Sequence, residues 1–339
     1  MTFLSIRRLL LAGVLLCLAG GANAELRALS DSQLSDVTGQ AFINLATDAA
    51  AGINYTRLNI GATVETQLNM NKLQLGLYDR AGEAANSADI SINNFALGTV
   101  NNQTGQINPF TIVDPYVEFA YDGNKMVGVR IGFNQAKGVL SGDIQSLTGN
   151  IPVHIKGTAD AIYNKATVGQ QLLLGLAGIY RSSTVEADAG LVTSGGASDP
   201  VRGTYAGMTN GSRLDCTNGC VPLWTDIVTG LFTSNSCAIL GITTCFKLSQ
   251  FQSLPVGDLS QAGLAGAAKG FFISLQSQDV QWRDMDSGQM ITALKGAFMN
   301  MPKYRDANGN LVSPINIDFN QAFNGIPRQD TCVGMNKGC

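Results

Sequence analysis

Alternation of apolar and polar residues restricts the fold of this chain most, and it is clearest between Tyr116 and Phe133. Two alternating runs there flank Asp122-Gly123-Asn124, where the glycine can take the positive φ that a tight turn needs. We therefore predict a β-hairpin at this point. The same period of two begins near Leu58 and continues through Val64, which predicts strands well before the hairpin.

Further strands are expected where the alternation returns. They cover residues 68–77, 90–97, 138–147, 151–156, 271–282 and 315–319, and a second hairpin is expected to turn at 306–310. The alternation slips by one residue at Lys72, which predicts a β-bulge or a strand break there. The segments share no fixed repeat length, so a solenoid is not indicated. We predict an all-β fold, mainly antiparallel, with an elongated or curved sheet and a small helical, disulfide-stapled insertion.

The first 24 residues have the pattern of an export signal. Arg7 and Arg8 precede an apolar stretch that is too short to span a bilayer, and Ala22-Asn23-Ala24 supplies the small residues of a cleavage site. Leu16 precedes Cys17 where lipid attachment requires a small residue, so no lipid anchor is expected. We expect an exported protein of the periplasm, the outer membrane or the cell surface.

The cysteines agree with export. The chain has seven, and removal of Cys17 with the signal leaves six, an even number that predicts three disulfides in an exported protein. Short loops close at the lowest entropic cost, so we predict pairing between neighbours. The expected pairs are Cys216 with Cys220, Cys237 with Cys245, and Cys332 with Cys339. A zinc site is not expected, because the spacings do not form the usual two-residue knuckles and the only histidine, His154, is distant.

Composition argues against nucleic acid as a partner. Charged residues make up 14% of the chain, and loss of Arg7 and Arg8 changes the formal net charge from -3 to about -5. Phosphate binding needs clustered Lys and Arg, and no two basic residues are adjacent after the signal. No nucleic-acid partner and no cofactor is expected.

Changes in pattern divide the chain into segments. After the signal at residues 1–24 come an acidic lead at 25–50 and a β-rich body at 51–190. A Gly- and Ser-rich loop with a cysteine-bearing apolar insertion occupies 191–260, and a β-rich continuation with a cysteine tail fills 261–339. In the lead, Ser30 can cap a short helical turn that Gly39 would end. One β domain with a long insertion fits the sequence as well as two domains.

Two apolar stretches interrupt the alternation. Residues 168–180 carry leucines on several faces, which predicts a short buried helix, and the second stretch lies among the cysteines. Their side chains form either ordinary core or a contact surface for a lipid, a hydrophobic small molecule or an envelope protein. The hydrophobic contact candidates are Leu172, Leu173, Leu174, Leu176, Trp224, Leu231, Phe232, Ile239, Leu240 and Ile242.

Candidate catalytic groups are few. His154 alternates with Val153 and Ile155, which predicts a surface position, and no Gly-x-Ser-x-Gly motif accompanies it. Asp284 and Asp286 are two residues apart and could share acid–base work, although such pairs are common in solvated turns. No catalytic residue is therefore predicted.

Asp306, Asn308 and Asn310 have the spacing of the first ligands of a calcium loop. Leu311 stands where that loop requires glycine, and Ile317 where it requires a bidentate glutamate. A hairpin turn is favoured instead, and no metal site is predicted.

The segment Leu29–Ile43 resembles the start of a group of exported γ-proteobacterial proteins. Their mature chains open with Leu-(Asp or Ser)-Asp, then Leu, then Val-(Thr, Ser or Glu)-Gly-Gln, and this chain reads Leu-Ser-Asp-Ser-Gln-Leu-Ser-Asp-Val-Thr-Gly-Gln-Ala-Phe-Ile. The group includes FilF-like pilus-assembly proteins with a β-rich body. The resemblance implies an envelope or surface role and assigns no functional residues.

These observations favour a non-enzymatic exported envelope protein that acts as a surface assembly or adhesion component, with envelope or surface proteins as partners. A carrier or docking protein for a lipid or hydrophobic ligand is the alternative, and a hydrolase is the third hypothesis. The sequence leaves the oligomeric state open.

Overall fold

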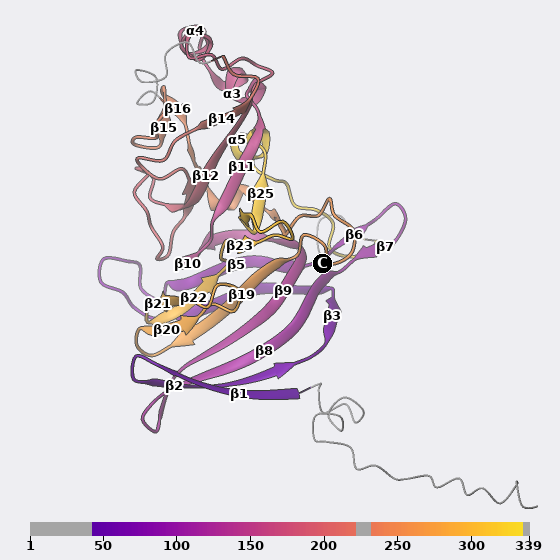
Figure 1. Cartoon of the computed structure of the whole chain (residues 1–339), viewed down its shortest axis with the longest axis vertical. Helices are drawn as coiled ribbons and strands as arrows, with labels where there is room; N and C mark the ends of the chain where they lie inside the picture. Colours follow the sequence, from indigo (N-terminus) through magenta and orange to yellow (C-terminus); the bar gives the residue numbers. More distant parts are fainter. Residues whose placement is uncertain (1–42, 222–231, 335–339) are drawn as a thin grey trace, which may run out of the picture. The chain divides into compact units, whose positions relative to one another are not determined.

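The computed structural model describes residues 43–221 and 232–334 (Figure 1). Every described residue belongs to one compact unit, which begins at Phe42. That unit consists mainly of antiparallel strands with few helices, which confirms the predicted fold class. The expected helical turn between Ser30 and Gly39 lies outside the described residues.

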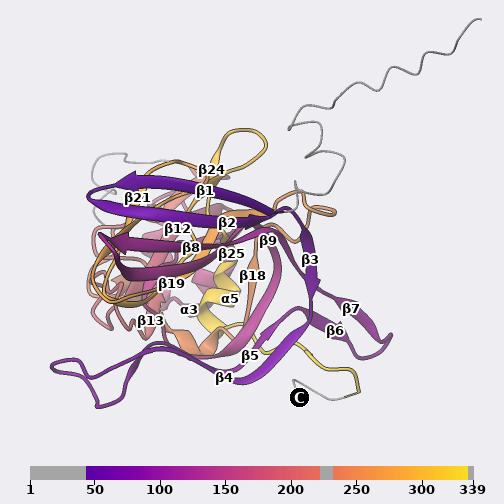
Figure 2. The same cartoon turned by 90° about the horizontal axis from the view of Figure 1, so that it is seen from below.

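The largest sheet has 11 strands and is strongly curved (Figures 1 and 2). Its neighbours are antiparallel except at one end, where β22 and β10 run parallel. The central path is, in spatial order, β1 (Ile43–Ala50), β2 (Ile53–Ile60), β8 (Phe110–Asp122), β9 (Lys125–Ser146), β19 (Ala268–Gln276), β22 (Gly296–Asn300) and β10 (Gly149–Asn150). The strands off this path are β3 (Thr63–Thr66), β4 (Leu68–Leu77), β5 (Ala88–Leu97) and β18 (Ser253–Val256).

A second sheet of six strands holds the helices and the insertion. Its members are β17 (Cys245–Lys247), β13 (Tyr205–Gly207), β12 (Thr184–Val192), β11 (Val153–Thr158), β25 (Ile315–Ile317) and β14 (Asp215–Asn218). The helices are α3 (Asp160–Lys165), α4 (Val168–Leu176), α5 (Phe319–Asn324) and the short 3-10 turn η2 (Leu248–Gln250). The two-stranded pairs are β6 (Thr99–Asn101) with β7 (Gln106–Asn108), β15 (Ala238–Ile239) with β16 (Ile242–Thr243), β20 (Val280–Arg283) with β21 (Met290–Ala293), and β23 (Tyr304–Arg305) with β24 (Leu311–Val312).

The predicted hairpin forms between β8 and β9. Asp122 pairs with Lys125, so Gly123 and Asn124 alone make the turn, and Gly123 has the expected positive φ of 56°. The second hairpin also forms, because β23 and β24 flank residues 306–310.

The bulge predicted at Lys72 is wrong. β4 pairs with β5 in one register along its whole length, through Lys72 opposite Asn93. The irregularity lies instead between β5 and β9, whose register shifts between Ser91 and Ile92 and again between Asn93 and Ala96, where Asn94 has a φ of 51°. All side chains of β4 are exposed or half-buried, so the order of apolar and polar residues along β4 does not reveal how it pairs with β5.

Three segment boundaries also differ from the prediction. Strand structure begins at Ile43, inside the segment expected to be a lead. The strand expected at 271–282 is two strands, because the chain turns between Gln276 and Val280. The last strand ends at Ile317, since Asp318 caps α5 by accepting a hydrogen bond from the Gln321 backbone N–H at 2.7 Å.

Candidate functional site

His154 lies at the surface of β11, as predicted. Its Nδ1 is 3.2 Å from Asp188 Oδ1, and its Nε2 is 3.6 Å from Glu186 Oε2. Burial alone would raise the pKa of Asp188, but hydrogen bonds from Lys303 and His154 hold that pKa below its ordinary value. Within the described residues, no hydroxyl group hydrogen-bonds to His154. The histidine therefore belongs to a surface charge network between neighbouring strands.

The paired carboxylates close a turn. Asp284 is buried and accepts hydrogen bonds from Ser287 Oγ at 2.6 Å and from the Asp286 backbone N–H at 3.1 Å. Asp286 forms an ion pair with Lys269 at 3.3 Å. Both groups thus hold the loop between β20 and β21, and they do not converge on a cleft.

Asp306 also has a structural role. Its side chain accepts backbone hydrogen bonds from Asn308 at 2.9 Å and from Asn310 at 2.8 Å, and bonding of this kind holds the pKa of Asp306 below its ordinary value. Residues 306–310 thus form the predicted hairpin turn, in which the Asp306 carboxylate is bonded to backbone N–H groups. Across residues 43–221 and 232–334, no three His, Cys, Asp or Glu side chains are grouped to hold a metal ion.

Two disulfides connect neighbours in the sequence. Cys216 is bonded to Cys220 and Cys237 to Cys245, with Cα–Cα distances of 6.3 and 5.2 Å. Cys332 is also disulfide-bonded, while Cys339, its expected partner, lies outside the described residues. Disulfides indicate an oxidising location outside the cytoplasm. No helix in the described ranges is long and apolar enough to cross a membrane.

The predicted contact residues of the insertion do not form one surface. Trp224 and Leu231 lie outside the described residues. Four side chains are buried and one, Leu240, packs half-buried against the core; the buried ones are Leu174, Phe232, Ile239 and Ile242. The remaining three leucines of α4 are exposed, namely Leu172, Leu173 and Leu176.

The expectation of a buried helix at 168–180 is therefore wrong. α4 spans only Val168–Leu176, beginning at a capping box formed by Thr167 and Gln170. A helix of this length at the surface turns one side to the core, and here that side carries Leu174 alone.

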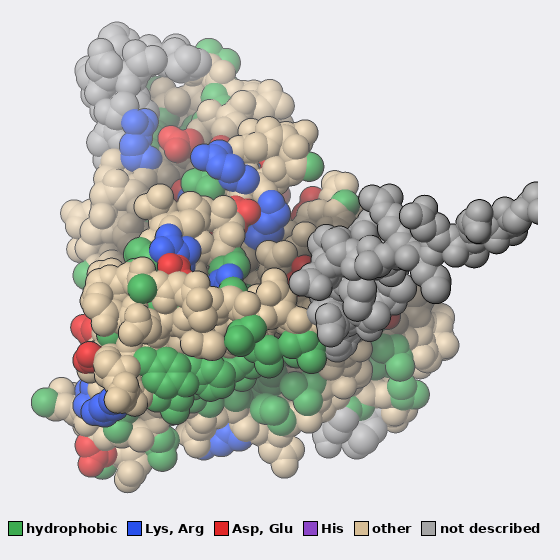
Figure 3. Space-filling model, turned by 60° about the horizontal axis from the view of Figure 1, so that its bottom comes forward, with side chains coloured by type: hydrophobic (Ala, Val, Ile, Leu, Met, Phe, Trp, Pro, Cys, Tyr) green, Lys and Arg blue, Asp and Glu red, His purple; other side chains and the backbone are tan. Residues whose placement is uncertain are grey.

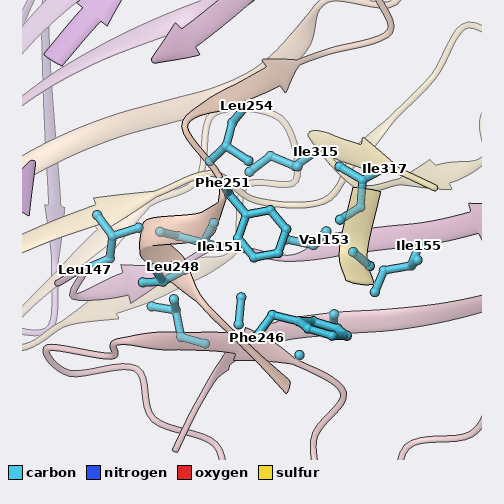
Figure 4. A pocket seen from close by; sticks show the side chains of 15 residues that line it. Leu147, Ile151, Val153, Ile155, Phe246, Leu248, Phe251, Leu254, Ile315 and Ile317 are labelled. Carbon is cyan, nitrogen blue, oxygen red and sulfur yellow. The ribbon is translucent and has the colours of Figure 1, made fainter. Parts of the chain in front are cut away.

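An apolar cavity lies beside the second sheet (Figure 4). Val153 and Ile155 of β11, Phe246 of β17 and Phe251 approach each other across it. Its volume is about 40 Å³. Pockets for small-molecule ligands usually measure about 300–1,000 Å³. The cavity is therefore a packing defect of the core and does not hold a lipid in this conformation.

A wider cleft of about 610 Å³, lined by both polar and apolar residues, lies between the loop at 257–267 and the β23–β24 hairpin. The buried Lys137 holds this loop by donating hydrogen bonds to three backbone carbonyls, those of Gln261, Gly263 and Ala265, at 2.7, 2.9 and 2.6 Å. Asp258 at the cleft accepts hydrogen bonds from Ser260. The polar groups at this cleft therefore serve mainly the loop's own structure.

One face of the large sheet is covered by the β20–β21 hairpin; we call it the covered face. It carries Arg57, Glu118 and Arg130, with Trp282 of the hairpin fully buried against it. Arg130 Nε donates to the Glu118 carboxylate, and its Nη1 donates to the backbone carbonyl of Arg283 at 2.9 Å. Glu118 also lies 3.7 Å from Arg57. The charges of the sheet are thus paired beneath the hairpin.

Aromatic rings surround the buried guanidinium of Arg130. Its Cζ lies 5.2, 4.9 and 5.1 Å from the ring centroids of Tyr116, Phe272 and Trp282. A Cβ at Gly132 would lie 2.3 Å from the Tyr116 ring, so only glycine leaves room for that ring beside Arg130. Burial raises the pKa of the Tyr116 hydroxyl to about 12.

The opposite side of the same strands carries a row of apolar residues. Directly paired residues of antiparallel strands share a face. The pairing therefore aligns one residue from each of five strands, in the order Leu45, Leu58, Val117, Ile131 and Ile273. Leu45 is 65% exposed and Ile131 is 54% exposed, and Leu275 in the next row is 40% exposed.

We call this side the open face. It comprises Ile43, Leu45, Thr47, Ala49, Asn54, Thr56, Leu58, Ile60, Val117, Phe119, Val129, Ile131, Phe133, Ile273 and Leu275, and none of these residues is charged. Phe133 and Ile273 also pack against the main core, so the face is closed toward β22 and open toward β1. Figure 3, which brings the bottom of the molecule forward, shows hydrophobic side chains gathered in a long continuous band.

Sequence reasoning missed this surface for a definable reason. The alternation in β8 and β9 separates two sets of residues, but it does not say which set is covered. The signal that was present is the absence of charge in one set, since Val129, Ile131 and Phe133 alternate with Gly128, Arg130 and Gly132.

A family model described as "Family of unknown function (DUF6160)" is similar to residues 3–107, less than a third of the chain. The matched segment includes β1 and β2, which contribute Leu45 and Leu58 to the open face. No curated protein and no solved structure gives a significant match.

Proposed function

We propose that this chain is a non-enzymatic, exported envelope protein that acts as a surface assembly component by docking a protein partner on its open face. The observation that carries this proposal is the uncharged apolar row across five strands, from Leu45 to Ile273. Single exposed hydrophobic residues are normal on protein surfaces, whereas contiguous apolar patches usually mark contact sites.

The form of the surface favours a macromolecule over a small ligand. Ligand sites usually enclose about 70–90% of a small molecule. The apolar cavity beside β11 has only about 40 Å³, and the cleft of about 610 Å³ beside the β23–β24 hairpin includes no open-face residue in its lining. The open face itself is a sheet surface with Ile131 more than half exposed. A partner protein with its own apolar face can cover such a sheet, as the second layer of a sandwich does.

Three observations support an envelope location for this role. The first 24 residues have the pattern of an export signal, and the described chain contains disulfides. The segment Leu29–Ile43 resembles the start of exported proteins that include FilF-like pilus-assembly proteins.

The roles of the candidate catalytic groups favour docking over hydrolysis. His154 is engaged by Glu186 and Asp188, and the carboxylates of Asp284 and Asp286 hold a turn. Each group thus has a structural partner in the folded chain. Hydrolysis is the hypothesis that these contacts support least.

Site-specific photo-crosslinking in cells tests the proposal. A benzophenone amino acid is placed at Ile131 or Leu275, and at the similarly exposed Leu311 of β24 as a control outside the open face. We expect crosslinks from the first two positions to one defined envelope protein, lost when the other open-face position is changed to Glu. The Leu311 position should give no such product. Crosslinks only to lipid, or the same products from all three positions, would overturn protein docking.

A further inference from the structure

The outer edge of β1 carries backbone groups that no described strand satisfies. β1 is the terminal strand of the sheet path, beside β2 (Figures 1 and 2). Exposed edges are usually protected by Pro, Lys or a bulge. β1 reads Ile-Asn-Leu-Ala-Thr-Asp-Ala-Ala, pairs with β2 without a register shift, and contains no such residue. This edge is therefore open to another strand.

The turn after β1 determines which of its N–H groups point outward. Ala50 pairs with Ile53 across a two-residue turn, in which Ala51 and Gly52 both have positive φ. In such a hairpin the closing pair is hydrogen-bonded, and hydrogen-bonded pairs then alternate along the ladder. The residues whose N–H and C=O groups point away from β2 are therefore Ile43, Leu45, Thr47 and Ala49. The Ala49 N–H donates a hydrogen bond to the Asp48 carboxylate at 2.8 Å, so pairing with another strand would replace that bond.

The same four residues place their side chains on the open face. They pair directly with Ile60, Leu58, Thr56 and Asn54 of β2. Asp48, the one charged residue of β1, lies on the other side, where its Oδ2 accepts a hydrogen bond from Arg283 Nε at 2.7 Å. A strand added at this edge would thus extend the open face.

We propose that β1 pairs antiparallel with β1 of a second copy of this chain, about a two-fold axis at Ala46. This inference deepens the proposed assembly role and rests on it for the class of partner. Ile43 then lies opposite Ala49 of the other copy, and Leu45 opposite Thr47. This register is the only one that uses all four outward-pointing residues of both strands. It forms about eight backbone hydrogen bonds, two of which replace the Ala49–Asp48 bonds of the two copies.

The proposed register also avoids contact between like charges and is consistent with a closed, two-fold symmetric dimer. Asp48 lies opposite Asn44 of the second copy, so like charges do not meet across the pair. A two-fold axis perpendicular to the sheet keeps both open faces on the same side and closes the assembly at two copies, because each edge covers the other. The apolar surface offered to a docking partner becomes continuous across the dimer.

Cysteine crosslinking tests the register in the full mature chain. In a pair that is not hydrogen-bonded, opposite Cα atoms are about 4.5 Å apart, which a disulfide can bridge. We expect Ala46→Cys to give a disulfide-linked dimer under mild oxidation. Ala49→Cys is the matched control, because it lies opposite Ile43 and should remain monomeric in denaturing electrophoresis. Equal crosslinking of both variants, or of neither, would overturn the register.

A proline variant tests the edge without a new cysteine. Thr47→Pro removes an outward N–H and leaves the bonds between β1 and β2 intact. We expect at least a tenfold rise in the dimer dissociation constant by sedimentation, with an unchanged circular dichroism spectrum. A native chain that is monomeric at every concentration, or a proline variant that dimerises normally, would refute edge pairing.

The docking role of the open face and the pairing of the β1 edge can be refuted independently of each other. Ile131→Glu should abolish open-face crosslinks and leave the Ala46→Cys dimer intact, because Ile131 lies in β9, which β2 and β8 separate from β1. Loss of docking with an intact dimer would count against the docking role alone. Docking with a monomeric chain would count against edge pairing alone.

Discussion

The two faces of the large sheet differ in what they carry and in what covers them. The covered face holds Arg130 and Glu118, both at least 95% buried, while Ile131 next to Arg130 is more than half exposed. The charged side chains are buried because they pair with each other and with backbone groups beneath the β20–β21 hairpin. The comparison teaches that polarity alone does not decide which face of a sheet becomes core.

The largest expected effect comes from breaking the buried ion pair. Arg130→Met should lower the free energy of unfolding by about 3–5 kcal/mol, because it leaves the Glu118 carboxylate buried without its main partner. Adding Glu118→Leu should restore most of this loss, since both charges are then gone. Guanidinium unfolding curves measure both variants.

A matched control for this experiment is Arg57→Met. Arg57 lies 3.7 Å from Glu118 and its side chain is more exposed than that of Arg130, so its removal should cost less. Equal losses for the two arginines would show that Arg130 is not the principal partner of Glu118.

An intermediate effect is expected from Tyr116 at alkaline pH. The hydroxyl makes no hydrogen bond to any described residue, and burial raises its pKa from 10.0 to about 12. The unfolded chain therefore ionises first as the pH rises. The contribution of the un-ionised Tyr116 hydroxyl to the free energy of unfolding is therefore complete below pH 10 and is lost progressively toward pH 12.

Tyr116→Phe should remove this alkaline loss, which amounts to about 2–3 kcal/mol at most. Stability at pH 7 should change little, because the hydroxyl has no described partner to lose. Unfolding curves between pH 8 and pH 12 compare the variant with the native chain. An unchanged alkaline slope would mean that Tyr116 ionises as freely in the folded state as in the unfolded one.

The smallest effect on stability is expected on the open face. Ile131→Thr should change the free energy of unfolding by no more than about 0.5 kcal/mol, because the side chain is already largely in water. Fluorescence of anilinonaphthalene sulfonate, a dye that binds exposed apolar surface, should fall.

Leu311→Thr serves as the control for that measurement. Leu311 is 62% exposed in β24 and does not belong to the open face, so its replacement should leave dye fluorescence unchanged. A similar fall for both variants would show that the dye reports scattered residues and not a continuous surface.

Local features of this fold could be predicted from the sequence. The β8–β9 hairpin depends on a glycine turn between adjacent runs, and the disulfides Cys216–Cys220 and Cys237–Cys245 close short loops. Each of these features is encoded within a few residues.

The site depends on distant contacts and could not be predicted in the same way. The β20–β21 hairpin that covers Arg130 is remote in the chain, since Arg283 lies 153 residues after Arg130. Alternation identifies the two faces of β9, but only this long-range contact decides that Arg130 is buried and Ile131 exposed. The exposed position of Leu172 on α4 is likewise a tertiary outcome.

The length of β9 has a further consequence. This single strand of 22 residues pairs with β8 and β19 in its first part and with β5 and β18 in its second. If the hydrogen bonds between one part of β9 and its neighbouring strands break, the other part is disturbed as well, because both belong to one continuous strand. Unfolding of the large sheet should therefore be cooperative, with amide hydrogens at both ends of β9 exchanging through one common opening event.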